Sequence, residues 1–453
     1  MAKKYKIDFF DEESHILYYP ASLSLSDSIK KIGFGSTIVE VKAEPHPNES
    51  NVLSISKGLA NSLYMPTFIK SIYLFQHEQL MILGPLVGIF SSGFTPYQVH
   101  PIGERSNTFA RLLSVQSSIG VVPFLFGEQH IDWDSGLIAG FFYQNGKWEK
   151  INIPFPNVIY DRLPNRKSEM QHQSRKVKEK LEKEYLIPWY NPGFFNKLEV
   201  HERLFQDEKI EKYLPETHLL TSNHQIEQML ATYGHVYIKP INGSLGIGVH
   251  QIIYDRNTNA YYCRYHDGKN HLLRFTSLEA LMNHVFAKKQ RSQLMIQQGI
   301  KLMREDKRSI DFRVHTNKDI NGDWKVSAIA AKVAGIGSPT THIKAGGEVK
   351  TLEELFFDTE MRMEIKEMLE QTALELAQSI EEHVEGIVGE IGFDLGIDKE
   401  NKIWLFEANS KPGRHIFAHP YMRDFELLTR KMSLSFAIYL TVKQFESPQT
   451  LFS

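Results

Sequence analysis

The last quarter of the chain reads Glu390-Ile-Gly-Phe-Asp394 and, after the polar loop 399–402, Phe406-Glu407-Ala-Asn409. Two apolar runs on either side of such a loop predict an antiparallel hairpin. Glu407 and Asn409 are two residues apart and therefore share one face of their strand. With that loop, Asp394 lies directly opposite Glu407 on the same face. We therefore expect three oxygen-bearing side chains to converge.

This convergence predicts a metal site. Two carboxylates and an amide oxygen are donors that a hard divalent ion accepts, so Asp394, Glu407 and Asn409 are expected to bind Mg²⁺, with Mn²⁺ as the alternative ion. Without an ion, the two carboxylates are expected to repel each other. The alternative is a solvent-facing sheet that merely carries polar residues, but the apolar neighbours Ile391 and Phe406 argue against it.

A glycine-rich loop, Asn242-Gly-Ser-Leu-Gly-Ile-Gly248, joins the apolar strand 236–239 to a second strand at 249–254. Its spacing fits neither the P-loop nor the Rossmann fingerprint, and it lies between two strands instead of opening a helix. Backbone N–H groups of such a loop can approach an anion closely, and Lys239 can supply a point charge to phosphate. We expect a phosphate-binding hairpin with a solvent-reaching lysine; a tight turn with a surface lysine is the alternative.

The remaining pattern indicates a multidomain chain of mixed α/β and α+β class. Residues 1–80 alternate short β-branched runs with turn clusters, which predicts a β-rich N-terminal module that does not contact nucleotide. Residues 81–195 alternate apolar strands with polar helical stretches, which predicts a central α/β layer. Residues 196–445 contain the two hairpins described above, an amphipathic helix at 352–384 and a closing helix at 424–444.

Composition excludes several classes of protein. The 453 residues carry 52 Lys and Arg against 54 Asp and Glu, a formal charge of -2, so the total charge gives no footprint of a nucleic-acid partner. The uncharged stretch 80–99 is interrupted by Gly and Pro, which favours buried strands over a membrane span. The single cysteine, Cys263, allows no internal disulfide and is expected to be an inert thiol in a reducing compartment. We expect a cytoplasmic protein without a membrane partner and leave a homo-oligomer open.

The order of several motifs over residues 196–425 resembles the ATP-grasp superfamily and is similar to the ribosomal-protein glutamate ligases. The ordered set is more specific than any one motif. Its members are Lys197, Tyr213-Leu-Pro-Glu-Thr217, Ile238-Lys239-Pro240 with the glycine loop, Gln297-Gln298-Gly299-Ile300, Asp311-Phe-Arg313, Ala330-Ala-Lys332 and Glu407-Ala-Asn409-Ser-Lys-Pro-Gly413. The whole sequence also resembles the YheC/YheD family of endospore coat-associated proteins of spore-forming bacteria.

The resemblance implies an ATP-grasp fold at 196–445, preceded by a pre-ATP-grasp layer, with ATP and Mg²⁺ as cofactors. Asp394, Glu407 and Asn409 match the magnesium ligands, and Arg313 and Lys332 the catalytic positions. Relatives often have Glu at position 298 and Arg at position 332. The ATP-binding positions implied are Lys197, Lys239, Gly243, Ser244, Gly246, Gly248, Gln297, Gln298 and Ile300.

The implied reaction has two steps. A substrate carboxylate attacks the γ-phosphate of ATP to give an acylphosphate and ADP, and an amine or thiol then displaces phosphate. The substrates are expected to be small molecules or peptides. His315, His342 and Arg414 would line the acceptor side, where their basic character favours an anionic substrate; for His315 a satisfied structural histidine is the alternative.

Two other functions stay open. The chain could be a spore coat assembly protein that retains the fold and binds nucleotide without turnover. It could also transfer phosphate to a small molecule, since that activity would use the same ATP residues. The family resemblance implies a location in the mother-cell cytosol or the spore coat.

Overall fold

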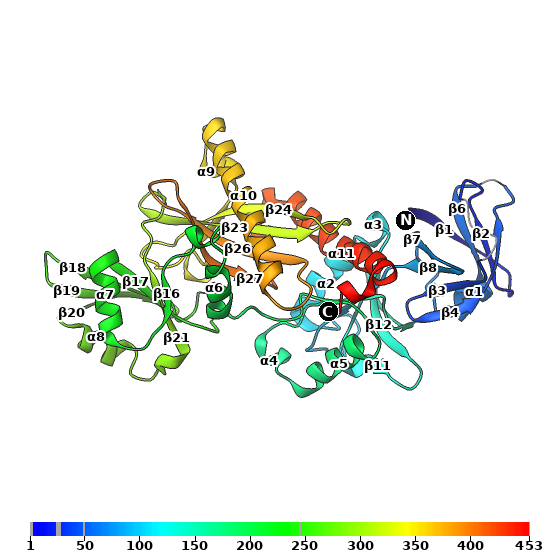
Figure 1. Cartoon of the computed structure of the whole chain (residues 1–453), viewed down its shortest axis with the longest axis horizontal. Coiled ribbons are helices and arrows are strands. Elements are labelled where there is room, and N and C mark those ends of the chain that lie inside the picture. The colour runs from blue at the N-terminus through cyan, green and yellow to red at the C-terminus, as the bar shows by residue number, and fades with distance from the viewer. Residues whose placement is uncertain (1–2, 24–28, 49, 244–245, 453) are drawn as a thin grey trace.

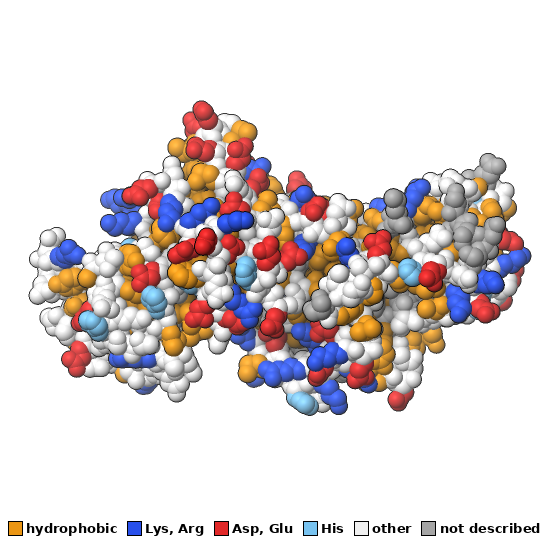
Figure 2. All heavy atoms as spheres, viewed as in Figure 1, with side chains coloured by type: hydrophobic (Ala, Val, Ile, Leu, Met, Phe, Trp, Pro, Cys, Tyr) orange, Lys and Arg blue, Asp and Glu red, His pale blue; other side chains and the backbone are white. Residues whose placement is uncertain are grey.

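The computed structural model describes residues 3–23, 29–48, 50–243 and 246–452. Its strands form four sheets that follow one another along an elongated molecule, from the N-terminal sheet at one end to the third sheet at the other (Figure 1). Lys and Arg side chains are interspersed with Asp and Glu on the face seen in Figure 2. Among the described residues, no helix combines the length and the apolar character needed to cross a membrane.

The first sheet has eight strands in the order β4-β3-β8-β7-β1-β6-β2-β5. One face packs on the second sheet, because Tyr5 and Ile55 share a core with Phe124 and Trp189. Its last strand ends at Gly84, past the expected boundary at residue 80. The elements are β1 Lys3–Phe10, β2 Ile16–Tyr19, β3 Lys31–Phe34, β4 Thr37–Glu40, β5 Lys42–Pro45, β6 Val52–Ser56, α1 Lys57–Ser62, β7 Ser71–His77 and β8 Leu80–Gly84.

The second sheet contains four mutually parallel strands in the order β10-β9-β14-β15; β12 pairs with β10, and β11 and β13 pair with β12. These strands are apolar on both faces because both are covered, as is usual for parallel sheets. The elements are β9 Leu86–Phe90, α2 Ser106–Leu113, α3 Gln116–Ile119, β10 Val122–Phe126, β11 Ile131–Asp132, β12 Leu137–Gln144, β13 Lys147–Pro154, β14 Val158–Asp161, α4 Arg166–Glu169, α5 His172–Lys183 and β15 Trp189–Tyr190.

The third sheet is antiparallel, in the order β16-β21-β17-β18-β19-β20, and packs with α7 and α8 around its own core. Cys263 is fully buried in that core, where burial raises the pKa of its thiol to about 12 and so disfavours the reactive thiolate; the inert thiol stays a prediction. The elements are α6 Lys197–Phe205, β16 Thr217–Leu219, α7 Asn223–Tyr233, β17 His235–Pro240, β18 His250–Asp255, β19 Ala260–His266, β20 Asn270–Phe275, α8 Leu278–Val285 and β21 Leu294–Gln298.

The fourth sheet has the order β25-β24-β23-β26-β27, with β22 beside β23. Helix α10 shares a core with Phe312 and Phe393, whereas α11 packs against β23 and β24 near Asn317 and also joins the core of the second sheet through Phe436. The elements are β22 Arg304–Glu305, β23 Arg308–Lys318, β24 Trp324–Val333, β25 Glu348–Lys350, α9 Leu352–Leu355, α10 Thr359–His383, β26 Glu390–Ile397, β27 Ile403–Asn409 and α11 Arg423–Glu446.

The expected mixed class is confirmed, and both predicted hairpins form, whereas the division at residues 80 and 195 stays a prediction. One expected helix was wrong. The amphipathic stretch 352–384 is two helices, because α9 ends at Leu355 and Asp358 caps a new helix by accepting a hydrogen bond from the backbone of Met361.

Candidate functional site

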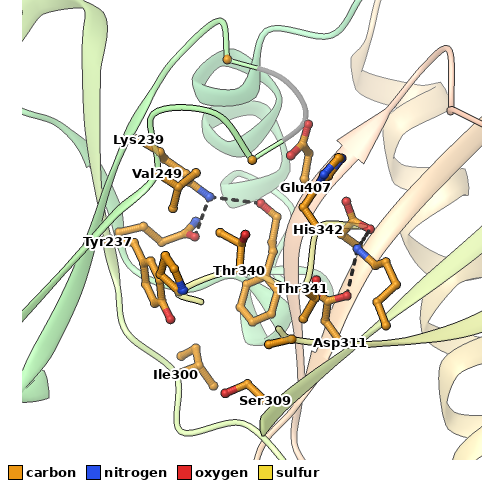
Figure 3. A pocket seen from close by; sticks show the side chains of 18 of the residues that line it. Tyr237, Lys239, Val249, Ile300, Ser309, Asp311, Thr340, Thr341, His342 and Glu407 are labelled. Atoms are coloured by element: carbon orange, nitrogen blue, oxygen red, sulfur yellow. Dashed lines mark hydrogen bonds and ion pairs between the residues drawn. The ribbon is translucent and has the colours of Figure 1, made fainter. Parts of the chain in front are cut away.

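A pocket of about 1020 Å³, partly open to solvent, lies between the third and fourth sheets (Figure 3). One wall comes from β17, the glycine loop and β21, and the other from β23, β24, β26, β27 and the loop after β24. Eleven of the predicted site residues line it: Lys197, Lys239, Gly243, Gly246, Gln297, Gln298, Ile300, Lys332, His342, Asp394 and Glu407.

Lys239 is buried, so the expectation of a solvent-reaching lysine was wrong. Its Nζ donates hydrogen bonds to Gln297 Oε1 at 2.7 Å and to the carbonyl of Phe406 at 3.4 Å. Gln297 is held in turn by donating to Thr217 Oγ1 at 2.9 Å. Burial, helped by the charge of Lys197, lowers the pKa of Lys239 to about 8. The lysine bridges the two walls of the pocket, since Phe406 belongs to β27.

Lys197 and Glu407 form the second link between elements. Lys197 is the first residue of α6, which begins where Asn196 caps the backbone amides of Leu198 and Glu199. Its Nζ lies 3.0 Å from Glu407 Oε2, and both side chains are largely buried. The pairing places a cation and a carboxylate at the same end of the pocket as Lys239.

Asp394 lies opposite Glu407 as predicted, but a β-bulge produces this pairing. The loop is 398–402, one residue longer than expected, and the register shift beyond Asp394 restores the pairing that the shorter loop would have given. Asn409 pairs with Gly392 on the same two strands.

Asp394 is surrounded by cations, which overturns the expected net repulsion between two carboxylates. Arg313 donates from Nε to Oδ1 and from Nη2 to Oδ2, both at 2.9 Å, and Lys332 Nζ donates to Oδ1 at 2.7 Å. Burial by itself would raise the pKa of Asp394, but the charges and hydrogen bonds of Arg313 and Lys332 outweigh burial and hold it well below its usual range. The aspartate is therefore ionised and paired.

The donor chemistry of this hairpin fits a hard divalent ion. Glu407 contributes a carboxylate and Asn409 an amide oxygen, while the Asn409 Nδ2 donates to the carbonyl of Gly392 at 3.3 Å. Asp394 has lone pairs beyond those used by Arg313 and Lys332, because a carboxylate offers about four acceptor positions. No group of three His, Cys, Asp or Glu suited to a metal occurs among the described residues. Mg²⁺ is usually held by one or two carboxylates together with substrate phosphates and waters.

The glycine loop contacts the opposite wall. Gly246 has φ +69°, and a Cβ at this position would lie 3.3 Å from His342 Cβ and 3.4 Å from Thr340 Oγ1. Gly248, with φ +78°, does not line the pocket, and Ser244 lies outside the described residues. The loop therefore requires glycine at 246 for its backbone conformation and for its approach to the loop 339–342.

Four other predicted residues lie beside the pocket and do not line it. Arg313 reaches it through Asp394, and Asn409 lies at the end of the hairpin. Arg414 turns away to Glu390 Oε1 at 3.2 Å. His315 is fully buried against Phe417, and neither ring nitrogen has a partner among the described residues, so the alternative of a structural histidine with satisfied hydrogen bonds was wrong.

Gln298 lines the pocket, but its side-chain oxygen accepts a hydrogen bond from the backbone N–H of Glu216 at 3.0 Å. That side-chain oxygen is therefore already bonded to the backbone just before β16. Its amide nitrogen has no such partner in the described part of the chain, so a donor stays available at this position.

Sequence reasoning missed Asp311, which lies between the loop 339–342 and Lys332. Its Oδ2 accepts from Thr341 Oγ1 at 2.5 Å, and its Oδ1 lies 2.9 Å from Lys332 Nζ. Burial raises the pKa of Asp311 despite the lysine. The alternation of a strand could have identified it, because Ser309, Asp311 and Arg313 share one face of β23.

Comparisons with known proteins confirm the resemblance. A family model described as YheC/D like ATP-grasp matches residues 186–440. The endospore coat-associated protein YheD of Bacillus subtilis (strain 168) is 38% identical over 455 residues, covering 99% of each chain. YheC of the same strain is 24% identical over 270 residues, 59% of this chain and 73% of YheC. Among solved structures, a D-alanine-D-alanine ligase from Coxiella burnetii matches 81% of this chain and 96% of its own with TM-score 0.46 and 12% identity. The chain thus belongs to the YheC/D-like ATP-grasp family.

Proposed function

We propose that the protein is an ATP- and Mg²⁺-dependent ligase that joins a carboxylate to an amine, or to a thiol, through an acylphosphate. One observation carries the proposal: a single pocket combines three lysines suited to phosphate with the carboxylates of Asp394 and Glu407. A structural scaffold has no need for this cluster, because buried charges stabilise a fold only weakly.

In this proposal Lys197 and Lys239 bind the phosphates of ATP, and the glycine loop supplies backbone N–H groups to them. Glu407, Asn409 and Asp394 hold Mg²⁺, with Mn²⁺ as the alternative ion. The bound ion neutralises charge on the phosphate oxygens. The nucleobase end lies along β21, near Ile300 and Gln298.

The first step forms a bond between a carboxylate oxygen and the γ-phosphorus while the bond to the β-phosphate oxygen breaks, which releases ADP. Arg313 and Lys332 stabilise the negative charge that moves during this transfer. In the second step the nitrogen of an amine attacks the acyl carbon and inorganic phosphate leaves.

The amine must lose a proton, and the two candidate acceptors are His342, which lines the pocket, and the neighbouring His415. The rings of His342 and His415 lie 5.8 Å apart. Burial, with the charge of Arg313, lowers the pKa of His415 to about 4, so its imidazole is neutral at pH 7. His342 Nδ1 already accepts a hydrogen bond from the backbone of Lys344 at 3.2 Å.

The coat-associated names of YheD and YheC support a role of this chain in a spore-forming cell, in the mother-cell cytosol or at the coat. The substrates we propose are amino acids or peptides.

The test is incubation with Mg-ATP and a set of amino acids and peptides, followed by measurement of ADP and of product masses. A product one water lighter than its two substrates, formed together with ADP, supports ligation. A product that gains phosphate indicates phosphotransfer instead. Nucleotide binding without ADP release from any mixture supports the assembly-protein alternative.

A further inference from the structure

A cluster of arginines lies at the carboxyl ends of the parallel strands of the second sheet. β9 lies between its parallel neighbours β10 and β14, so the strand order reverses at β9. In open parallel sheets, ligands bind outside the carboxyl ends of the strands at such a reversal point. Ser91 and Ser92 follow β9, and Arg162 follows β14. Arg105 joins these ends: its Nη1 donates to Ser91 Oγ at 3.0 Å and its Nη2 to the carbonyl of Ser92.

Arg414 completes the cluster from the loop after β27. Glu390 is fully buried and forms ion pairs with both arginines: its Oε1 lies 3.2 Å from Arg414 Nη2, and its Oε2 lies 3.6 Å from Arg162 Nη1. The phenol of Tyr160 also donates to Glu390. One carboxylate is thus shared between two guanidinium groups that are 10% and 16% exposed.

The positive charge exceeds the negative charge at this position. Arg105 has no acidic partner among the described residues, and burial together with the charge of Arg162 lowers its pKa. Arg414 Nη1 is buried and has no hydrogen-bond partner in the part of the chain that the structure describes. Leaving a buried charged donor unpaired is costly, so an anion is the chemistry that these groups lack.

None of the three arginines lines the pocket, but Arg414 is linked to the pocket wall through the neighbouring His415. Arg313 and His315 lie two residues apart on β23, and the charges of both Arg313 and Arg414 act on His315. His415, next to Arg414, faces His342 of the pocket wall. A molecule whose carboxylate reacts beside Arg313 therefore has basic groups on its far side.

We propose that Arg105, Arg162 and Arg414 bind a second carboxylate of the substrate, so that the enzyme acts on di- or polycarboxylates such as acidic amino acids or peptides. This inference rests on the proposed function. Guanidinium groups suit the task because their planar donors match a carboxylate in a bidentate manner. Ser91, already oriented by donating to the carbonyl of Arg162 at 2.8 Å, holds two of these segments together.

The test compares two dipeptides of matched size by calorimetry, in the presence of Mg²⁺ and a non-hydrolysable ATP analogue. L-glutamyl-L-glutamate is expected to bind about tenfold or more tightly than L-glutaminyl-L-glutamine. Arg105→Gln is expected to remove this preference, and Arg105→Lys to keep part of it. The matched control is Arg111→Gln, on α2 but 66% exposed and paired with Glu426, which should keep the full preference.

Equal affinity for the two dipeptides, absence of binding by both, or an unchanged preference in a folded Arg105→Gln variant would each overturn the proposal. Thermal melting establishes that each variant is folded. If Arg105→Gln does not melt cooperatively, Arg105→Lys decides: a reduced preference supports the proposal, and a full preference overturns it. In a competition experiment, inorganic phosphate and glutarate are each used to displace the acidic dipeptide. If phosphate displaces it at the lower concentration, the cluster binds phosphate groups and the assignment to a carboxylate is wrong. If the wild-type protein does not bind the ATP analogue at all, that result would instead overturn the proposed function.

Discussion

Lys239 joins the two walls of the pocket, and its environment makes its charge sensitive to pH. Burial lowers its pKa to about 8, whereas in the unfolded chain the proton stays bound up to roughly pH 10.4. The native state therefore binds fewer protons than the unfolded state between these values, and this group makes the protein more stable as the pH rises through 8. The same deprotonation removes the charge that phosphate requires.

ATP binding should therefore be coupled to proton uptake by Lys239. The phosphates raise the pKa of the lysine again, so at pH 8 we expect uptake of up to about half a proton per nucleotide. Calorimetry in buffers of different ionisation enthalpy measures this number. Lys239→Met should abolish the uptake and weaken binding; an uptake that persists in this variant would assign the proton to another group.

Asp394→Asn should destabilise the protein, because Asp394 is paired with two cations and is not dominated by the repulsion from Glu407 that the sequence predicts. The substitution leaves Arg313 and Lys332 buried without their shared carboxylate, which typically costs about 3–5 kcal/mol in the free energy of unfolding. Urea denaturation at pH 7 measures the change. Glu407→Gln is the matched control with a smaller expected loss, because Glu407 has one cationic partner among the described residues and is 26% exposed.

A stability of Asp394→Asn equal to that of the wild type would mean that Arg313 and Lys332 do not depend on this carboxylate. The direction of the pKa shift of Asp394 also determines how the stability of the protein changes in acid. Because the pKa of Asp394 is lowered in the native state, its contribution is complete above its ordinary value of about 4 and is lost as the pH falls below that value.

At the scale of elements, the two hairpins show what alternation can and cannot predict. The pattern of apolar and polar residues identified β26 and β27 and the face shared by Glu407 and Asn409, since side chains alternate in any strand. It could not reveal the β-bulge after Asp394, because a bulge depends on packing between strands. Nor could it show that Arg313 and Lys332, on β23 and β24, lie against Asp394, because that contact needs the sheet order β24-β23-β26.

Gly246 tests whether the approach of the glycine loop to the opposite wall matters for binding. Gly246→Ala should cost about 1–2 kcal/mol of stability, as alanine does in a left-handed conformation. Its methyl group would also push against His342 and Thr340, so we expect nucleotide affinity to fall about tenfold. The control is Gly234→Ala, with φ +75° and open space around a Cβ. Equal nucleotide affinities of the two variants would contradict the role of this contact.

At the scale of the whole molecule, the cores show which parts depend on one another. The first and second sheets share a core, so removal of residues 1–80 would expose Phe124 and Trp189 even though the pocket is lined only from Lys197 onward. Sequence periodicity assigned these segments to separate modules because it carries no information about which faces meet. The third sheet, by contrast, has a core of its own.

The third sheet should therefore open more readily than the rest. Hydrogen exchange measures the free energy of the opening that exposes each amide. We expect this opening free energy to be lower for β18 and β19 than for β23 and β26, which are covered by α10 and α11. Mg-ATP should slow the exchange of β17 and of the described amides of the glycine loop, since it binds both walls. Uniform exchange across the third and fourth sheets, unaffected by nucleotide, would contradict this division.

The most direct test of the account is capture of the acylphosphate by hydroxylamine. Wild-type protein, Mg-ATP, hydroxylamine and a series of amino acids and acidic peptides are incubated together, and hydroxamates are measured alongside ADP. The account predicts that at least one carboxylate yields a hydroxamate in an amount equal to the ADP released, and that Lys239→Met yields neither. Release of ADP without hydroxamate from any carboxylate, or no release of ADP at all, would contradict the proposed ligase.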